Sequence, residues 1–241
     1  MSIEPFRISV GDIEVDVVRK RIKNLHLGVY PPHGRVRVAA PEGVSDEAVR
    51  LAIISRMAWI KRQRAKFQAQ VRQSERAYVS GETHFHFGHR YRLRLVERRG
   101  PANVKLRGDR IELSVPPGSD GFSRERVMQA WQRRELRDRA EPLLDKLSAI
   151  MAVRRPLLGI KRMKTRWGSC NPAASRIWLN LELAKKAPDC IEYLVVHELA
   201  HLIEPNHGER FIALMDRFMP RWRIVRDELN AAPLAHEDWE Y

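Results

Sequence analysis

The chain is poor in cysteine, glycine and proline and contains no long apolar run. Among its 241 residues are 2 Cys, 13 Gly and 14 Pro. Two thiols are too few for a disulfide framework, which favours a reducing compartment. So little Gly and Pro excludes collagen-like and low-complexity proteins. No apolar run approaches the roughly 18 residues of a membrane span, and the N-terminus lacks the apolar region of a secretory signal. We therefore expect a cytoplasmic protein with no membrane partner.

Acidic residues are scarce relative to basic ones. The chain has 44 Lys and Arg against 30 Asp and Glu, a formal net charge of +14. Residues 1–154 contain 31 basic and 18 acidic side chains, whereas residues 155–241 contain 13 and 12. This excess of basic residues makes nucleic acid, nucleotides and acidic substrates candidate partners of the basic N-terminal region. The alternative is that the arginines form a scattered, solvated surface.

Hydrophobic periodicity predicts both strands and helices in the first 151 residues. Alternation of apolar and polar residues predicts short antiparallel strands over residues 6–40 and 84–115. Apolar residues at helical spacing predict helices over residues 45–72 and 123–151. Pro142 is expected to kink or split the second helix. No internal repeat stands out.

These elements predict an α+β protein with two regions. Residues 1–120 form a basic N-terminal region, antiparallel and β-rich with helices, and residues 121–241 form the second domain. The boundary is expected at the loop that contains Pro116 and Gly118. Within the first region, alternation along one strand puts three arginines on a single face, where they are candidates for binding substrate or phosphate. These are Arg90, Arg92 and Arg94.

The strongest chemical signal is the HELAH motif from His197 to His201, inside the apolar-rich run IEYLVVHELAHLIE. Two His four residues apart differ by only about 40° around a helix, so both imidazoles can meet one metal ion. Glu198 lies about 100° from His197, where its carboxylate can hold a metal-bound water, as in H-E-x-x-H zinc hydrolases. The alternative is a set of polar core residues that satisfy one another.

A catalytic zinc usually has three protein ligands and one open position. Pro205 is expected to end the helix and let the chain turn back, which makes His207 the predicted third ligand. Glu204 competes because it shares a helix face with His197, although it lies about 10 Å further along the axis. Alternatively, Glu204 or Glu209 orients a ligand imidazole. The remaining candidate ligands are Glu209 and His236.

A β-hairpin is predicted just before this helix. Its first strand runs through residues 163–167, and its turn lies at residues 171–175. An edge strand beside the active-site helix can pair with an extended peptide. Arg166 and Trp167 are candidate substrate-binding residues, although core packing is the alternative role for Trp167. We expect Ser169 and Cys170 to be structural, because no partner for a nucleophile follows at a recognisable local spacing.

The chain from about Arg19 to Trp222 resembles the YgjP-type family of predicted zinc metallopeptidases, relatives of the SprT-like and WLM minimal zincins. The motifs that carry the resemblance are RWGSC at 166–170, Leu179-Asn180, HELAH at 197–201 and Asn206-His207. The resemblance implies a zincin-like catalytic domain with a helix and a hairpin at its active site. It further implies that zinc binds to His197, His201 and His207 and that Glu198 is the general base.

Three functions follow from these observations. The first is a zinc-dependent metallopeptidase that cleaves a peptide or protein substrate. The second is a metal-dependent nucleotide phosphohydrolase, similar to a nucleoside triphosphate pyrophosphatase, whose arginines bind phosphate. The third is a nucleic-acid-associated protease or binding module that uses the basic N-terminal region. Zn²⁺ is the expected cofactor, although imidazole ligands also suit nickel and cobalt.

Overall fold

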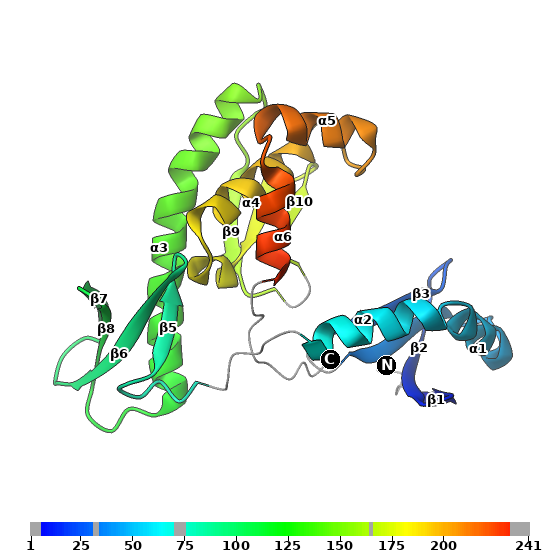
Figure 1. Ribbon diagram of the computed structural model, residues 1–241, viewed down its shortest axis with the longest axis horizontal. Coiled ribbons are helices and arrows are strands. Elements are labelled where there is room, and N and C mark those ends of the chain that lie inside the picture. Colours follow the sequence, from blue (N-terminus) through cyan, green and yellow to red (C-terminus); the bar gives the residue numbers. More distant parts are fainter. Residues whose placement is uncertain (1–5, 31–33, 70–75, 164–165, 232–241) are drawn as a thin grey trace. The chain divides into compact units, whose positions relative to one another are not determined.

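The computed structural model describes residues 6–30, 34–69, 76–163 and 166–231 (Figure 1). Within the described ranges the chain forms two compact units: unit 1 spans residues 6–69, and unit 2 spans residues 76–231. This division differs from the expected boundary at residues 120 and 121. The reason lies in helix α3 (Gly121–Ile150), which packs against the sheet before it as well as the elements after it.

Unit 1 is a four-stranded sheet followed by two helices. Its elements are β1 (Phe6–Val10), β2 (Ile13–Lys20), β3 (His26–Tyr30), β4 (Arg35–Pro41), α1 (Asp46–Ser55) and α2 (Met57–Ala69). The strand order is β1-β2-β4-β3. One continuous helix over residues 45–72 was expected, but the helix is interrupted at Arg56, which caps the C-terminus of α1. Buried Val49, Ile53 and Ile60 pack on the sheet from these two helices.

Unit 2 begins with a second four-stranded sheet. Its strands are β5 (Thr83–His86), β6 (His89–Glu97), β7 (Asn103–Arg107) and β8 (Arg110–Val115), in the order β5-β6-β8-β7. Met128 and Trp131 of α3 pack against its inner face. Pro142 does not split α3, which runs as one helix of 30 residues. Figure 1 shows α3 beside both this sheet and the elements that follow.

The expectation of purely antiparallel strands is wrong. β2 and β4 are parallel, as are β6 and β8, although the other neighbours in these two sheets are antiparallel. Alternation in the sequence shows which side chains of a strand face the core. It does not report the direction of the neighbouring strand, because both kinds of pairing use the same two-residue period.

The two sheets also share one topology, so the structure contains a repeat that inspection of the sequence missed. Each has its second and fourth strands parallel and is followed by a helix. Equivalent core residues, turn residues and helix N-caps lie 75 positions apart in the chain. Examples are Val36/Ile111, Val38/Leu113, Pro41/Pro116, Gly43/Gly118 and the N-caps Ser45/Asp120. The repeat is hard to see in the sequence because different apolar side chains fill the equivalent core positions.

The remaining part of unit 2 contains a small sheet and the HELAH motif, of which all but His201 lies on one helix. Its elements are β9 (Leu157–Lys161), β10 (Gly168–Asn171), β11 (Arg176–Asn180), the 3-10 helix η1 (Leu181–Lys185), α4 (Pro188–Ala200), α5 (Glu209–Phe218) and α6 (Trp222–Ala231). A hairpin with the predicted turn is present as β10 and β11, and β9 adds to β11 in parallel. The predicted position of its first strand is wrong, because Met163, Arg166 and Trp167 are not in a strand. The first strand begins at Gly168, and residues 164–165 lie outside the described residues. Within the described ranges, no helix is long and apolar enough to cross a membrane.

Two histidines are buried on β5, away from the HELAH motif. The ring of His84 lies 3.0 Å from the carboxylate of Glu82. The ring of His86 is 3% exposed and stacks on Trp131 at a centroid distance of 4.4 Å. Its Nδ1 has no hydrogen-bond partner among the described residues. Burial, and secondarily the nearby His89, lowers the pKa of His86 from 6.5 to about 4.

His86 should therefore make the folded protein sensitive to acid. Between pH 6.5 and about 4 the unfolded chain takes up a proton at this ring that the folded chain does not. Stability should be lost as the pH falls through this window, by about 1.4 kcal/mol per pH unit. In His86→Phe, urea unfolding followed by Trp fluorescence should show a shallower loss. The exposed His26 supplies the control His26→Gln, and an identical slope in His86→Phe and the wild type would contradict the prediction.

Candidate metal centre

The apolar helix α4 carries His197 and Glu198 of the motif. It begins with Pro188 at its first turn, and nine of its residues are buried. The helix ends at Ala200 rather than near residue 204, and His201 is its C-cap. The amides of Leu202 and Ile203 bond to carbonyls three residues earlier, which tightens the chain before Pro205. This early end allows the chain to turn back toward the helix within a few residues.

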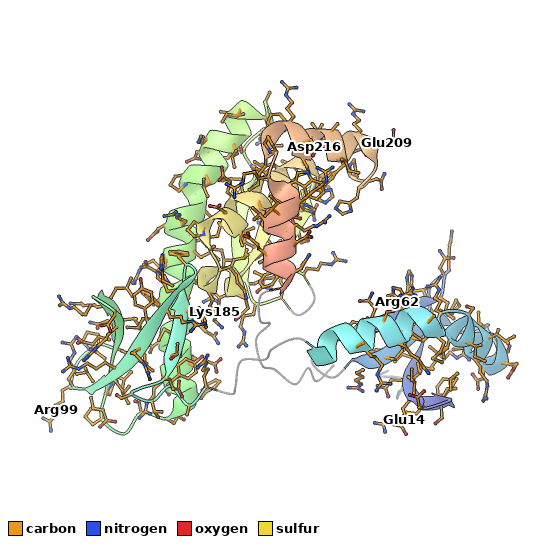
Figure 2. The ribbon with its side chains drawn as sticks, viewed as in Figure 1. Glu14, Arg62, Arg99, Lys185, Glu209 and Asp216 are labelled. Carbon is orange, nitrogen blue, oxygen red and sulfur yellow. The ribbon has the colours of Figure 1, made fainter. Side chains whose placement is uncertain are left out.

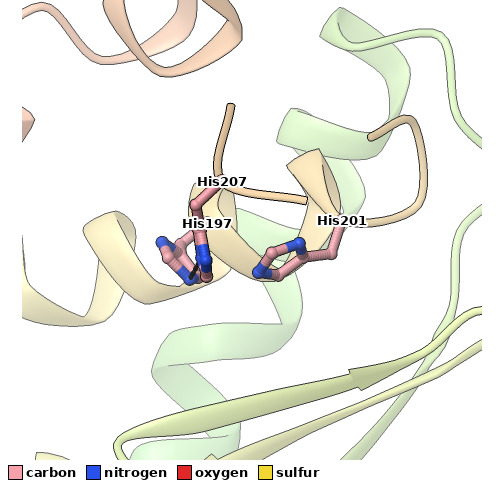
Figure 3. Close-up of side chains that lie close together, drawn as sticks. All are labelled: His197, His201 and His207. Atoms are coloured by element: carbon pink, nitrogen blue, oxygen red, sulfur yellow. Dashed lines mark hydrogen bonds between the residues drawn. The ribbon is translucent and has the colours of Figure 1, made fainter. Parts of the chain in front are cut away.

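The turn brings His207 beside His197 and His201 (Figure 3). The candidate donor atoms of the three imidazoles all lie within 4.8 Å of one another. Nε2 of His207 lies 3.2 Å from Nε2 of His197. Two nitrogens bound to one tetrahedral zinc at its usual bond length lie about 3.3 Å apart. The spacing and the all-nitrogen donor set therefore fit a zinc ion.

The surroundings of His197 and His201 favour the neutral imidazole, which is the form that binds metals. Burial lowers the pKa of His197 to about 4, and the neighbouring His201 and His207 act in the same direction. Burial also lowers the pKa of His201. Nδ1 of His201 lies 3.3 Å from the backbone carbonyl of Glu204, to which it can donate, which leaves Nε2 free to bind a metal. Little proton release is therefore needed for metal binding at neutral pH.

Glu198 lies next to the histidines with its carboxylate buried. The residue is 3% exposed, and Oε2 has no hydrogen-bond partner among the described residues. Burial raises the pKa of Glu198 to about 8, and the charge of Arg166 opposes this shift. A Cβ added at Gly168 would lie 2.2 Å from Oε1 of Glu198. Glycine at the start of β10 therefore leaves the space that this carboxylate occupies.

A pocket of about 690 Å³ joins these groups. Its walls include the three histidines, Glu198, β10, Tyr193 of α4 and Arg226 of α6. Of the predicted substrate-binding residues, Arg166 and Trp167 line this pocket. Trp167 is half-buried, with the ammonium of Lys186 5.4 Å from its ring centre. Arg90 and Arg92 are exposed on β6, a strand of the other sheet, and do not line the pocket.

Asn180 is a positioning residue whose role sequence reasoning did not identify. Its side-chain amide donates to the carbonyls of Met163 and Arg166, both at 2.8 Å, and its carbonyl oxygen accepts from the amide of Glu182. Its backbone amide bonds to the carbonyl of Trp167. One buried side chain thus holds the segment that leads into β10. The signal available in the sequence was a polar residue at the end of an apolar strand.

The other candidate ligands differ from His207 in their surroundings. The carboxylate of Glu204 accepts from the amide of Asn206, and Glu209 is an exposed residue in the first turn of α5. Neither belongs to the group of close donor atoms found among the described residues. His236 lies outside the described residues. Burial and the charge of Glu198 raise the pKa of the Cys170 thiol to about 11, which disfavours a thiolate nucleophile.

Zinc affinity should therefore distinguish His207 from Glu204. His207→Ala removes one of three converging imidazoles and should weaken zinc binding by more than the roughly 10- to 100-fold cost of losing a supporting partner. Glu204→Ala keeps the backbone carbonyl beside His201 and should bind zinc nearly as well as the wild type. Competition with a chromophoric chelator measures both affinities. Equal weakening in the two variants would make Glu204 a ligand.

The chain is similar to known metallopeptidases. The profile of a family described as YgjP-like, metallopeptidase domain, matches residues 23–232. The metallopeptidase zymogen abylysin of Pyrococcus abyssi is similar with a TM-score of 0.36 and 23% identity, over 37% of this chain and 90% of that one. For the metallopeptidase zymogen jannalysin of Methanocaldococcus jannaschii the TM-score is 0.35 and the identity 17%, over 37% and 92%. Comparison with curated proteins finds no significant match. Because the family profile matches most of its length, the chain belongs to the YgjP-like metallopeptidase family.

Proposed function

We propose that this protein is a zinc-dependent metallopeptidase. His197, His201 and His207 hold the metal, and Glu198 is the general base. The observation that carries the proposal is the convergence of three imidazoles beside the buried Glu198 in one pocket, where Oε2 of this carboxylate has no hydrogen-bond partner among the described residues. Membership of the YgjP-like metallopeptidase family supports the same function.

The residues of the pocket divide the chemistry between them. When bound, zinc lowers the pKa of a water ligand toward about 7 and polarises a carbonyl. Oε2 of Glu198, which has no other partner among the described residues, accepts a proton from the attacking water. The same atom then delivers the proton to the leaving nitrogen of the peptide. Burial raises the proton affinity of Glu198, which suits a group that must hold a proton between the two steps.

The edge strand β10 is suited to bind the peptide. β10 is the terminal strand of its sheet in the order β10-β11-β9, so one of its edges has no neighbouring strand in the described part of the chain. Gly168, Ser169 and Cys170 of this strand line the pocket. An extended peptide that pairs with this edge would place a scissile bond beside Glu198.

Nucleotide phosphohydrolysis is the second candidate. Arg166 and Arg226 line the pocket, and guanidinium groups bind phosphate through two parallel hydrogen bonds. The same zinc site and the same general base could serve an attack on phosphorus. Arg226 also donates a hydrogen bond to the carboxylate of the adjacent Asp227. This negative charge offsets part of the attraction that Arg226 would exert on a phosphate.

One parallel assay tests both candidates. Purified, zinc-loaded protein is incubated with casein-derived peptides and, separately, with nucleoside triphosphates. We expect peptide cleavage that a chelator abolishes and zinc restores. Glu198→Gln should lose turnover while its zinc content stays near one per chain, because the metal ligands are untouched. Mass spectrometry of peptides and a phosphate release assay provide the readouts.

The outcomes separate the alternatives. Phosphate or pyrophosphate release without peptide cleavage would replace the first candidate by the second. Turnover that persists in Glu198→Gln would remove Glu198 from the mechanism. Loss of zinc from this variant would instead indicate that the carboxylate is needed for metal binding.

Gly168→Ala should impair turnover without removing the metal. The added methyl group would collide with Oε1 of Glu198 and displace the carboxylate. A displacement of about 1 Å at a catalytic group can cost roughly 100-fold in rate. We expect such a loss in kcat with nearly unchanged zinc affinity. Gly43→Ala is the control, because a Cβ at this position meets nothing within 4 Å; equal kcat in Gly168→Ala and wild type would refute the steric argument.

A further inference from the structure

The outer face of the β5–β8 sheet carries a row of like charges. Arg92 of β6 is directly opposite Arg110 of β8, and Arg110 is directly opposite Arg107 of β7. Three arginine residues are therefore neighbours across three strands. A guanidinium nitrogen of Arg92 donates to the carbonyl of Gly81, and that of Arg110 lies 3.7 Å from the carboxylate of Asp109 in the preceding turn. All three residues are exposed.

More positive charge surrounds this row. In the next row of the face, Arg94 and Lys105 lie on either side of Glu112, and Arg90 follows on β6 beside Phe85. Glu112 is thus the one carboxylate among the strand residues that form these rows. Arg99 extends further from the loop after β6 (Figure 2). The inner face is different, because there α3 packs on Leu93, Ile111 and Leu113.

Like charges directly opposite each other destabilise a sheet. The equivalent sheet of unit 1 avoids this cost. By the offset of 75 residues, Arg35 of β4 takes the place of Arg110, and its neighbour on β3 is Tyr30 rather than an arginine. The row of Arg7, Asp16 and Arg37 corresponds instead to the row of Arg94 and Glu112, and both rows alternate in sign. Asp16 is buried and also pairs with Arg35. The topology itself therefore does not require a row of arginines. A negatively charged ligand would explain why the row is present in unit 2.

The composition of the face points to a nucleic acid rather than a protein. The centre of a protein interface is rich in aromatic and apolar anchors and poor in charge. Here the centre is occupied by Arg92, Arg110 and Arg107, whereas Phe85 lies at the margin. Neighbouring β-strands are about 4.8 Å apart. Long arginine side chains at this spacing can therefore contact successive phosphates of one nucleic-acid strand. An open sheet face lacks the helix or ribbon that enters a duplex groove, which favours a single strand.

We propose that the outer face of the β5–β8 sheet binds the phosphate backbone of single-stranded nucleic acid without sequence preference. The row of three arginines is the centre of this site, and Arg90, Arg94 and Lys105 extend it. The site lies on a different sheet from the metal centre and uses none of the residues that line the zinc pocket. The proposed site would use part of the excess positive charge of the chain to bind phosphate.

Binding to a labelled oligothymidine of about 20 nucleotides tests the proposal. Fluorescence anisotropy with the zinc-loaded, full-length protein is measured between about 50 and 200 mM salt. We expect affinity to fall steeply with salt. The triple variant Arg92→Ala, Arg107→Ala, Arg110→Ala should bind at least about tenfold more weakly, with a salt slope smaller by about 2, since each phosphate contact contributes about 0.7.

A matched variant separates the site from the net charge. Arg50→Ala, Arg56→Ala, Arg62→Ala removes three exposed arginines of unit 1, among them Arg62 on α2 (Figure 2). This control should bind nearly as well as the wild type. Circular dichroism and zinc content verify that both triple variants are folded. Should the first one misfold, Lys105→Ala with Arg107→Ala on the edge strand β7 replaces it.

Three results would overturn the proposal. The first is the absence of oligothymidine binding by the wild type. The second is equal loss of affinity in the variant and its control, because the net charge alone would then account for binding. The third is equal affinity for polyglutamate and oligothymidine, which would make the face a docking surface for acidic proteins.

Discussion

The candidate metal centre depends on the burial of Glu198, whose Oε2 has no hydrogen-bond partner among the described residues. Burying a polar group in this way is costly, and most of α4 around it is apolar and buried. Burial also lowers the pKa of His197 and of His201. Exclusion of water thus has two effects, because it raises the proton affinity of Glu198 and lowers that of these two imidazoles. A polar core without function would satisfy these groups by mutual hydrogen bonds.

The position of Glu198 is set by backbone rather than by side chains that contact it. Gly168 leaves room for the carboxylate, and Asn180 holds the segment that leads into β10. β10 is in turn fixed to β11, which lies at the centre of its sheet. The active-site helix and the edge strand therefore keep their spacing through a few specific contacts. In the proposed function, the strand that binds the peptide and the general base are therefore in contact at Gly168.

The repeated sheet and helix show how one fold serves different roles. In unit 1 the buried Asp16 pairs with Arg7 and Arg35 on the outer face. In unit 2 the equivalent face carries the row of arginines, and the helix that follows it also packs against α4. The proposed nucleic-acid site and the proposed zinc site therefore lie on different sheets of unit 2.

Local sequence patterns determined the elements and most of the candidate site. Alternation located the strands, helical spacing located the helices, and the interval between His197 and His201 follows from the geometry of one helix. The proximity of His207 to His197 was also predictable, because Pro205 favours a turn back toward the helix, although α4 already ends at Ala200. Tertiary structure alone decided the parallel pairs, the repeat, the row of Arg92, Arg110 and Arg107, and the contact of Gly168 with Glu198. The physical reason is that these features join residues far apart in the chain, whose register is set by packing rather than by local preference.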